Sequence, residues 1–347
     1  MNREEEASDD SAAGTGSVPI LRRPLLVSAK YPVRTLTSPT YLIAIGVIAF
    51  FAWWASGSPL SFFAVSLVYA SIYITLALAW DFSSGLTGYL NFGLPFFFGL
   101  GAFTAGYLSW HGNRQVPELL LASFGMGLLA GLLFSLPTLR LRGPYFTLLS
   151  LLLPLIGADF IIAFWTELHL PTEGFEFLPF LASTPEAELV FLSVVNGVLL
   201  TAFLLLRDSH FGLVLRGIRD DEDALGSEGI WTFPYKVAAF TLASGVVAFS
   251  GATYALVYTY GGVDTFDFIF ILFPVLIVIL GGIGELAGAV LAGYLVVLLF
   301  QYLSPVLSTL TFIIFSVIAI LLVLFLPEGL LKPIRSFVRF MRTGAPA

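Results

Sequence analysis

Cysteine is absent from the 347 residues, so the chain can form neither a disulfide nor a thiolate metal site. The three histidines, His111, His169 and His210, do not show the spacing of a metal site. No Gly-Lys dipeptide occurs, which excludes a P-loop, and no HExxH or GxSxG pattern indicates an intramembrane enzyme. Any nucleotide chemistry on which the protein depends must therefore belong to another chain.

Charged residues are also scarce. They make up 11% of the chain, against about 25% in a typical soluble domain, while hydrophobic residues make up 58%. Such a chain cannot present enough polar surface to be soluble, so the composition predicts an all-α membrane protein with about ten spanning helices. Ten apolar runs approach the roughly 20 residues that a spanning helix needs. They are 40–56, 62–82, 93–110, 118–137, 144–166, 189–206, 237–258, 268–282, 286–303 and 309–326.

Lysine and arginine are distributed unevenly between these runs. If the N-terminus is cytoplasmic, ten crossings place fifteen of the sixteen lysine and arginine residues inside and only Arg114 outside. This bias matches the excess of positive charge that cytoplasmic loops carry, and it predicts that both termini are cytoplasmic. The segments placed inside between the crossings are 83–92, 138–143, 207–236 and 283–285.

The two ends of the chain differ from the apolar body. Residues 1–36 are first acidic and then basic, which indicates a disordered cytoplasmic segment and not a signal peptide. Residues 332–347 form a basic cytoplasmic tail, and residues 37–331 between them are predicted to form one transmembrane domain. Much of the net charge of −7 lies in the first ten residues, so it does not point to a charged partner. Nucleic acid is not an expected partner.

One polar segment, 207–236, interrupts the apolar body. Its four cations and six carboxylates cannot lie in hydrocarbon, where each buried charge costs several kcal/mol. Phe211, Leu215, Ile218 and Leu225 recur at helical spacing, which predicts a short amphipathic helix held against the membrane face with its charges turned outward. The segment is then either a solvated loop that covers the bundle or a docking surface for a soluble partner, and the residues alone leave both interpretations open.

Two apolar regions contain glycines too dense for ordinary helices. Unwound backbone at membrane depth survives only when it is buried in protein or lines a cavity, and a Gly-interrupted segment in each half of a transporter indicates the substrate path. Close helix packing through small residues is the alternative. Two carboxylates adjoin the glycines. The candidate path residues are Asp81, Gly85, Gly88, Asn91, Gly93, Gly281, Gly282, Gly284 and Glu285.

Five stretches resemble the inner-membrane permease subunits of ABC importers for branched-chain amino acids, whose wider family includes ribose-type sugar permeases. Each is a weak apolar-plus-glycine pattern alone, but their order and spacing are specific, and together they cover roughly residues 40–332. The stretches are LALAWDFSSGLTGYLNFGLPFFFGLGAFTAGYL (76–108), LRLRGPYFTLLSL (139–151), GLVLRGIRDDEDALGSEGI with YKVAAFTLASGVVAFSGATYAL (within 212–256), VILGGIGELAGAVLAG (278–293) and LVLFLPEGLLKP (322–333).

The resemblance implies that 207–236 is a cytoplasmic coupling segment that seats in a groove of an ATPase subunit. The chain would then be a permease subunit of a binding-protein-dependent importer, without enzymatic activity or a bound cofactor, because ATP is used by partner subunits. The implied partners are two cytoplasmic ATPases, a second related permease, an extracytoplasmic solute-binding protein and the lipid bilayer of a prokaryotic plasma membrane. The implied coupling residues are Arg216, Arg219, Asp220, Asp221 and Glu222.

Two departures from the family pattern bear on the solute. Leu94 follows Gly93 where a histidine is common, and Asp81 stands where an asparagine is usual. Urea, a short amide or another small polar solute would therefore suit the path as well as a branched-chain amino acid. The alternative from another class is an ion-coupled secondary transporter, in which Asp159 would be the proton site.

Overall fold

The computed structural model describes residues 36, 38–57, 61–112, 115–141, 143–167, 174–307 and 317. Helices dominate these residues, as the composition predicts, and one antiparallel pair of two-residue strands, β1 (Phe175–Glu176) and β2 (Tyr260–Gly261), is the exception. The helices are α2 (Pro39–Gly57), α3 (Ser61–Trp80), α4 (Leu94–Trp110), α5 (Val116–Thr138), α6 (Pro144–Glu167), α7 (Pro185–Arg207), α8 (His210–Ser227), α9 (Phe233–Tyr258), α10 (Ile269–Gly281) and α11 (Leu286–Leu307).

Nine of the ten predicted apolar runs coincide with helices, namely α2 to α7 and α9 to α11. Seven helical segments of the described residues are long and apolar enough to cross a membrane. The chain is therefore an all-α multi-pass membrane protein. The tenth run, 309–326, the N-terminal segment before residue 36 and the tail 332–347 lie outside the described residues. Ten crossings and two cytoplasmic termini thus stay predictions.

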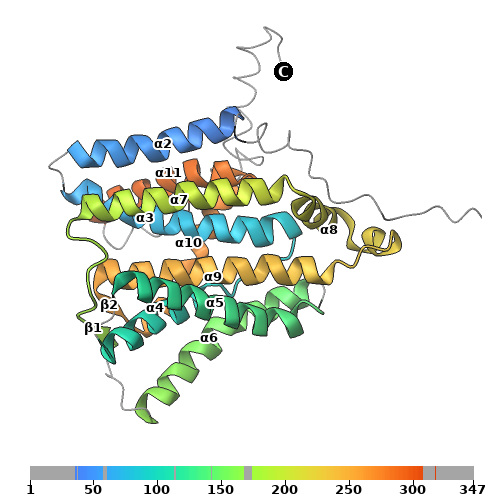
Figure 1. Ribbon diagram of the computed structural model, residues 1–347, viewed down its shortest axis with the longest axis horizontal. Coiled ribbons are helices and arrows are strands. Elements are labelled where there is room, and N and C mark those ends of the chain that lie inside the picture. The colour runs from blue at the N-terminus through green and yellow to red at the C-terminus, as the bar shows by residue number, and fades with distance from the viewer. Residues whose placement is uncertain are drawn as a thin grey trace, which may run out of the picture.

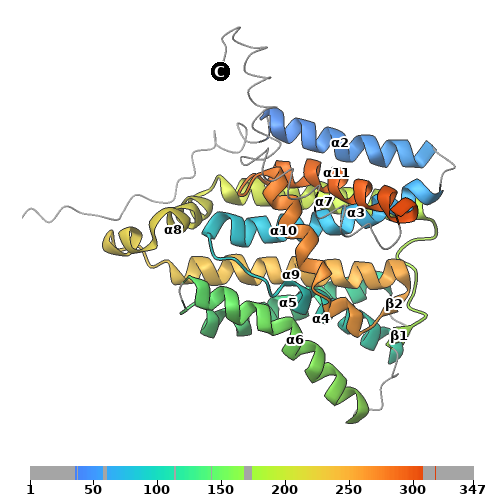
Figure 2. The same ribbon diagram turned by 180° about the vertical axis from the view of Figure 1, so that it is seen from behind.

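Helix α3 lies at the centre of the bundle, between α7 and α11 on one side and α9 and α10 on the other (Figures 1 and 2). It is the most buried of the seven candidate spans, whereas α5 and α6 are the least buried. Helix α8 lies at one end of the bundle and the β1–β2 pair lies near the other end in both views. The candidate functional site described below lies at the α8 end.

Helices α4 and α9 cross with their backbones in contact, because each has a glycine at the crossing. A Cβ atom on Gly101 would lie 1.9 Å from the carbonyl oxygen of Ala248, and one on Gly251 would lie 1.9 Å from the carbonyl oxygen of Phe98. Such close approach through small residues is typical of helix packing in membranes. Here the glycines of an apolar helix serve packing.

Both predicted Gly-interrupted regions are breaks in helical structure. After α3 the chain makes a single π-helical turn, η1 (Asp81–Gly85), and from residue 88 to 93 it runs as unwound backbone to the start of α4 (Figure 2). The indole of Trp80 donates to Asn91 O at 2.8 Å, and the hydroxyl of Ser150 accepts from Phe92 N at 3.0 Å. Polar groups of neighbouring elements thus satisfy the unwound backbone, as a segment inside an apolar bundle requires.

The second interruption is the tight connection between α10 and α11. Its backbone has φ of +100° at Gly282 and +84° at Gly284, a left-handed conformation that residues with a Cβ rarely adopt. Glycine is therefore needed here by the backbone itself. This turn lies at the same end of the bundle as α8 and η1, because its backbone is hydrogen-bonded to the side chains of Arg219 in α8 and Asp81 in η1.

Candidate functional site

Helix α8 packs on the bundle through one apolar face, as the helical spacing predicts. Val214, Leu215 and Ile218 are buried on that face. The prediction of one continuous helix is wrong, however, because Asp221 has non-helical backbone angles of φ −162° and ψ 103°. The carboxylate of Asp221 accepts from the backbone N–H groups of Asp223 and Ala224 at 3.0 and 2.9 Å. This is the pattern of an N-cap, so Asp221 ends one helical segment and begins the next.

The guanidinium of Arg219 joins α8 to both interruptions. Its Nη1 donates to Gly85 O at 2.8 Å and to Ile283 O at 3.4 Å. The two interruptions also touch each other directly, because Asp81 Oδ1 accepts from Gly284 N at 2.6 Å across 203 positions of sequence. We call this set, formed by Asp81, Gly85, Arg219, Ile283 and Gly284, the inner junction.

Three of the predicted path glycines are explained by these contacts. A Cβ atom on Gly85 would lie 2.0 Å from Asp81 Oδ1. One on Gly88 would lie 3.2 Å from Arg219 Cγ, and one on Gly284 would lie 3.2 Å from Arg219 Nη1. Glycine at these positions therefore allows the Asp81 and Arg219 side chains to reach the backbone of both interruptions.

A second arginine supports the junction from the end of α7. Arg207 Nη1 lies 3.5 Å from Gly284 O and 3.5 Å from Glu285 Oε2, and its Nε donates to Asp208 Oδ1 at 3.0 Å. Both side chains of the Arg207–Glu285 pair are partly exposed. The pair is a weak contact at the rim of the junction, since partly exposed ion pairs are screened by solvent.

Glu222 takes part in a second cluster, which was not among the sequence-based predictions. Its carboxylate accepts from Lys236 Nζ at 2.7 Å, from the hydroxyl of Thr232 at 2.7 Å and from the hydroxyl of Tyr89. Lys236 is only 3% exposed, and it also donates to Leu139 O at 3.4 Å. We call these four side chains, Tyr89, Glu222, Thr232 and Lys236, the Glu222 cluster.

The charge state of Glu222 follows from these contacts. Partial burial raises the pKa of its carboxyl group, but the hydrogen bonds from Lys236, Tyr89 and Thr232 outweigh burial and hold the pKa below its ordinary value. Glu222 is therefore an anion that neutralises a buried lysine. Tyr89 lies in the unwound part of the first interruption, so the cluster gives α8 a second attachment to that interruption.

The five predicted coupling residues are thus divided between two faces of α8. Arg219 and Glu222 bind groups of the membrane domain, although Arg219 is also an exposed residue. Asp220, Asp221 and Arg216 are exposed. Among the described residues, Arg216 donates to the backbone oxygens of Gly212 and Arg207, at 3.4 and 3.5 Å. The prediction that the charges of this helix are turned outward is therefore wrong for Glu222. The exposed three remain candidates for a partner-facing surface.

Not all of the predicted path residues meet at the junction. Asn91 and Gly93 form a separate turn in which Asn91 Oδ1 accepts from Gly93 N at 2.8 Å. A Cβ atom on Gly281 would lie 2.5 Å from Gly288 C, so Gly281 serves the packing of α10 on α11. The structure brings Asp81, Gly85 and Gly284 together, with Glu285 beside them.

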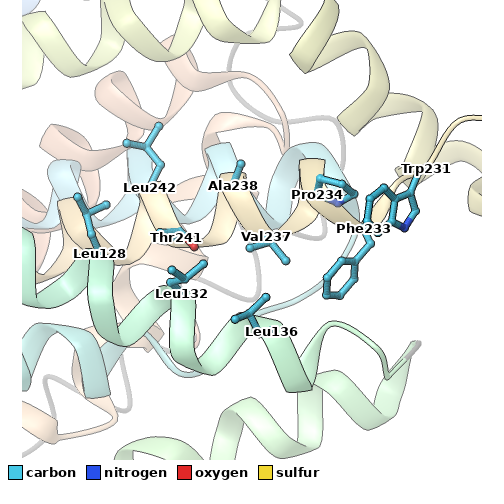
Figure 3. Close-up of a pocket in the computed structure, with 10 residues that line it drawn as sticks. All are labelled: Leu128, Leu132, Leu136, Trp231, Phe233, Pro234, Val237, Ala238, Thr241 and Leu242. Atoms are coloured by element: carbon cyan, nitrogen blue, oxygen red, sulfur yellow. The ribbon is translucent and has the colours of Figure 1, made fainter.

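The grooves on the outer surface of the bundle differ chemically from the junction. One of about 590 Å³ lies between α5 and α9 and is lined almost wholly by apolar side chains such as Leu132, Leu136, Val237 and Trp231 (Figure 3). Another, of about 860 Å³, lies between α2 and α11. Apolar walls suit lipid chains or other helices and offer little to a polar solute. The junction is the better candidate for function.

Unwound backbone inside an apolar helical bundle, tied to a charged helix at one end, is the architecture of a membrane transport permease. Residues 62–326 match the family model described as branched-chain amino acid transport system / permease component, so the chain belongs to this family.

Two curated relatives carry the same printed name, high-affinity branched-chain amino acid transport system permease protein LivM. The chain is similar to the protein of Escherichia coli (strain K12), with 26% identity over 308 residues that cover 79% of this chain and 71% of the relative. It is also similar to the protein of Salmonella typhimurium, with 26% identity over 298 residues that cover 76% of this chain and 68% of the relative. No solved structure matches the chain.

Proposed function

We propose that this chain is the membrane-spanning permease subunit of an ATP-driven, binding-protein-dependent importer in the plasma membrane of a prokaryote. Its solute is a branched-chain amino acid, as in the names of its relatives, or a similar small polar molecule. The observation that carries the proposal is the position of Arg219, because one side chain of a surface helix contacts both interruptions of the bundle.

This position gives α8 a mechanical role. The exposed face with Arg216, Asp220 and Asp221 is directed to the cytoplasm and docks to an ATPase, while Arg219 and Glu222 hold the membrane domain. Closure of the ATPases then moves α8, and this movement changes the contacts by which α8 holds the two interruptions. The chain itself binds no cofactor in this scheme, since ATP is used by the partner subunits.

The partners follow from the same scheme. Two cytoplasmic ATPases supply energy, a second related permease completes the membrane part, and an extracytoplasmic binding protein delivers the solute. The segments that the charge bias places inside, 83–92, 138–143, 207–236 and 283–285, gather at the α8 end through the contacts of Arg219, Lys236 and Arg207. Their common position supports the proposed topology, with this end on the cytoplasmic side.

Energy supply separates this proposal from an ion-coupled secondary transporter. We expect solute uptake by proteoliposomes to require ATP together with both ATPases and the binding protein, and to be absent when only a proton or sodium gradient is imposed. Asp159→Asn should leave the rate unchanged. Uptake driven by an ion gradient without ATP, and lost in Asp159→Asn, would show that the chain is a secondary transporter. When uptake requires the binding protein, ligand-induced melting shifts of that protein identify the solute.

Reversal of an exposed charge tests the docking face. Arg216→Glu should weaken co-purification of the ATPases on the order of tenfold or more, because a reversed charge at an interface meets repulsion where it previously met attraction. Arg140→Glu is the matched control, since Arg140 is also an exposed arginine but lies outside α8. Equal retention of the ATPases by the two variants would contradict the assignment of α8 as the docking element.

A further inference from the structure

The two interruptions are held together at the α8 end by two side chains. Asp81 of η1 accepts from Gly284 N at 2.6 Å, and Arg219 of α8 spans Gly85 O and Ile283 O. If the proposed function is correct, both interruptions belong to the solute path. We propose that Asp81 and Arg219 form the inner gate of that path, which is closed in this structure and opens when α8 carries Arg219 away.

The two attachments of α8 differ in how easily they can separate. Lys236 and Glu222 are buried together, with side-chain exposures of 4% and 14%, so separating them would leave a lysine uncompensated in an apolar surrounding. Arg219 is itself exposed, and its guanidinium donates to neutral carbonyl oxygens. Water can replace these hydrogen bonds. The Glu222 cluster is therefore the pivot of α8, and Arg219 is the contact that releases.

Asp81 is the positioning residue on the membrane side of the gate. It is fully buried, and only one of its carboxyl oxygens is satisfied, since Oδ2 has no hydrogen-bond partner among the described residues. Buried polar atoms in permanently packed regions are almost always paired. The charged groups that act on it electrostatically are Arg207 of α7, Arg219 of α8 and Glu285 before α11. Its second carboxyl oxygen can therefore bind water or solute when the junction opens.

Withdrawal of Arg219 would leave space and polar backbone. Gly85, Gly88 and Gly284 have no side chains to fill the gap, and their close neighbours are Asp81 and Arg219 themselves. Four polar groups would then face the opening. They are the carbonyl groups of Gly85 and Ile283, the N–H of Gly284 and the carboxyl group of Asp81. These groups can exchange hydrogen bonds with a small polar or zwitterionic solute, whereas an apolar solute would leave them unpaired.

A single introduced thiol can report this opening, because the chain contains no cysteine. Ser83 is fully buried in η1, and Ser83→Cys changes little in size. In the assembled complex in inside-out membrane vesicles without nucleotide, we expect slow labelling of Ser83→Cys by a membrane-impermeant maleimide. Adding Arg219→Ala should raise the labelling rate at least tenfold. Adding Arg140→Ala, which removes an exposed arginine outside α8 and outside the junction, should not.

Two further variants separate gating from loss of structure. Ser123→Cys is fully buried on α5, far in sequence from η1, and its labelling should stay slow in the Arg219→Ala background. Asp81→Asn keeps an oxygen that can accept from Gly284 N, so the labelling of Ser83→Cys should stay slow in that background. Asp81→Leu has no such oxygen, and labelling of Ser83→Cys should be fast in it. Equal labelling of Ser83→Cys in the Arg219→Ala and Arg140→Ala backgrounds would overturn the proposal, and so would faster labelling at Ser123→Cys in the Arg219→Ala background.

The gate and the proposed function can fail separately. ATP should accelerate labelling of Ser83→Cys in the otherwise unchanged complex, and Arg219→Ala should give solute leakage without ATP. If labelling stays slow in Arg219→Ala while uptake by the unchanged protein depends on ATP, the gate proposal is wrong and the importer proposal holds. If labelling is fast in Arg219→Ala while uptake by the unchanged protein needs no ATP, the gate proposal holds and the ATP-driven importer proposal is wrong.

Discussion

Gly101→Ala and Gly251→Ala are each expected to destabilise the protein by at least about 3 kcal/mol, the upper part of the range for overpacking, and to reduce its yield in the membrane sharply. In both variants the new methyl group would meet a backbone carbonyl of the opposite helix at 1.9 Å. A side chain could rotate away, but a backbone carbonyl within a helix cannot. Relief then requires α4 and α9 to separate along much of their contact. The measurement is the free energy of unfolding in mixed micelles with increasing SDS.

Glycines on the open surface of the same bundle are the matched controls for this prediction. A Cβ atom on Gly125 of α5 or Gly46 of α2 would meet nothing within 4 Å. Alanine there should be neutral or stabilising by up to about 1 kcal/mol, since it favours the helix relative to glycine. If Gly101→Ala and Gly125→Ala unfold at the same SDS fraction, α4 and α9 do not cross as the structure shows.

The apolar helices could be predicted from the sequence because length and hydrophobicity alone decide whether a segment suits a bilayer. The glycine clusters likewise predicted where helices are interrupted. They did not show what each glycine is for. Gly281 allows α10 to pack on α11, whereas Gly284 has a left-handed backbone and lies against Arg219. Both uses require a small residue, so composition cannot distinguish them.

The contacts of α8 were harder to predict because their partners are remote or are backbone atoms. Arg219 binds the carbonyl oxygen of Gly85, 134 positions away, and a carbonyl group is present at every residue. The helical stripe of α8 was predicted correctly, since Leu215 and Ile218 are buried and Phe211 and Leu225 pack against the core. The break at Asp221 was not predicted, and it accompanies an inward-facing Glu222. Periodicity cannot show where a helix will bend to pair a buried lysine.

Lys236 also illustrates a signal that was available in the sequence. It was assigned to the polar segment because the apolar run was taken to begin at residue 237, but α9 begins at Phe233 and includes it. A lysine in the first turn of a spanning helix must reach water or a carboxylate. The nearby acids made a buried ion pair a reasonable expectation, and only the fold decides that Glu222 is the partner.

Glu222→Leu is the second substitution for which we expect a large effect, a loss of about 3–5 kcal/mol in the free energy of unfolding. It removes the only carboxylate in an ion pair with Lys236 among the described residues and leaves the ammonium group buried. Lys236→Met should cost less, because Glu222 is more exposed and keeps its bonds from Tyr89 and Thr232. The double variant should recover most of the loss, since an apolar pair can replace a buried ion pair.

A double-mutant cycle over these variants gives the interaction energy of the pair directly. The pH dependence provides an independent check whose sign follows from the pKa of Glu222, which is lower in the folded protein than its ordinary value. The stabilisation is complete above the unfolded pKa of about 4.3 and is lost as the pH falls through the folded value. Wild-type protein should therefore lose stability in acid faster than the double variant does. Additive effects of the two substitutions, or equal acid sensitivity, would show that Glu222 and Lys236 do not form the pair on which α8 pivots.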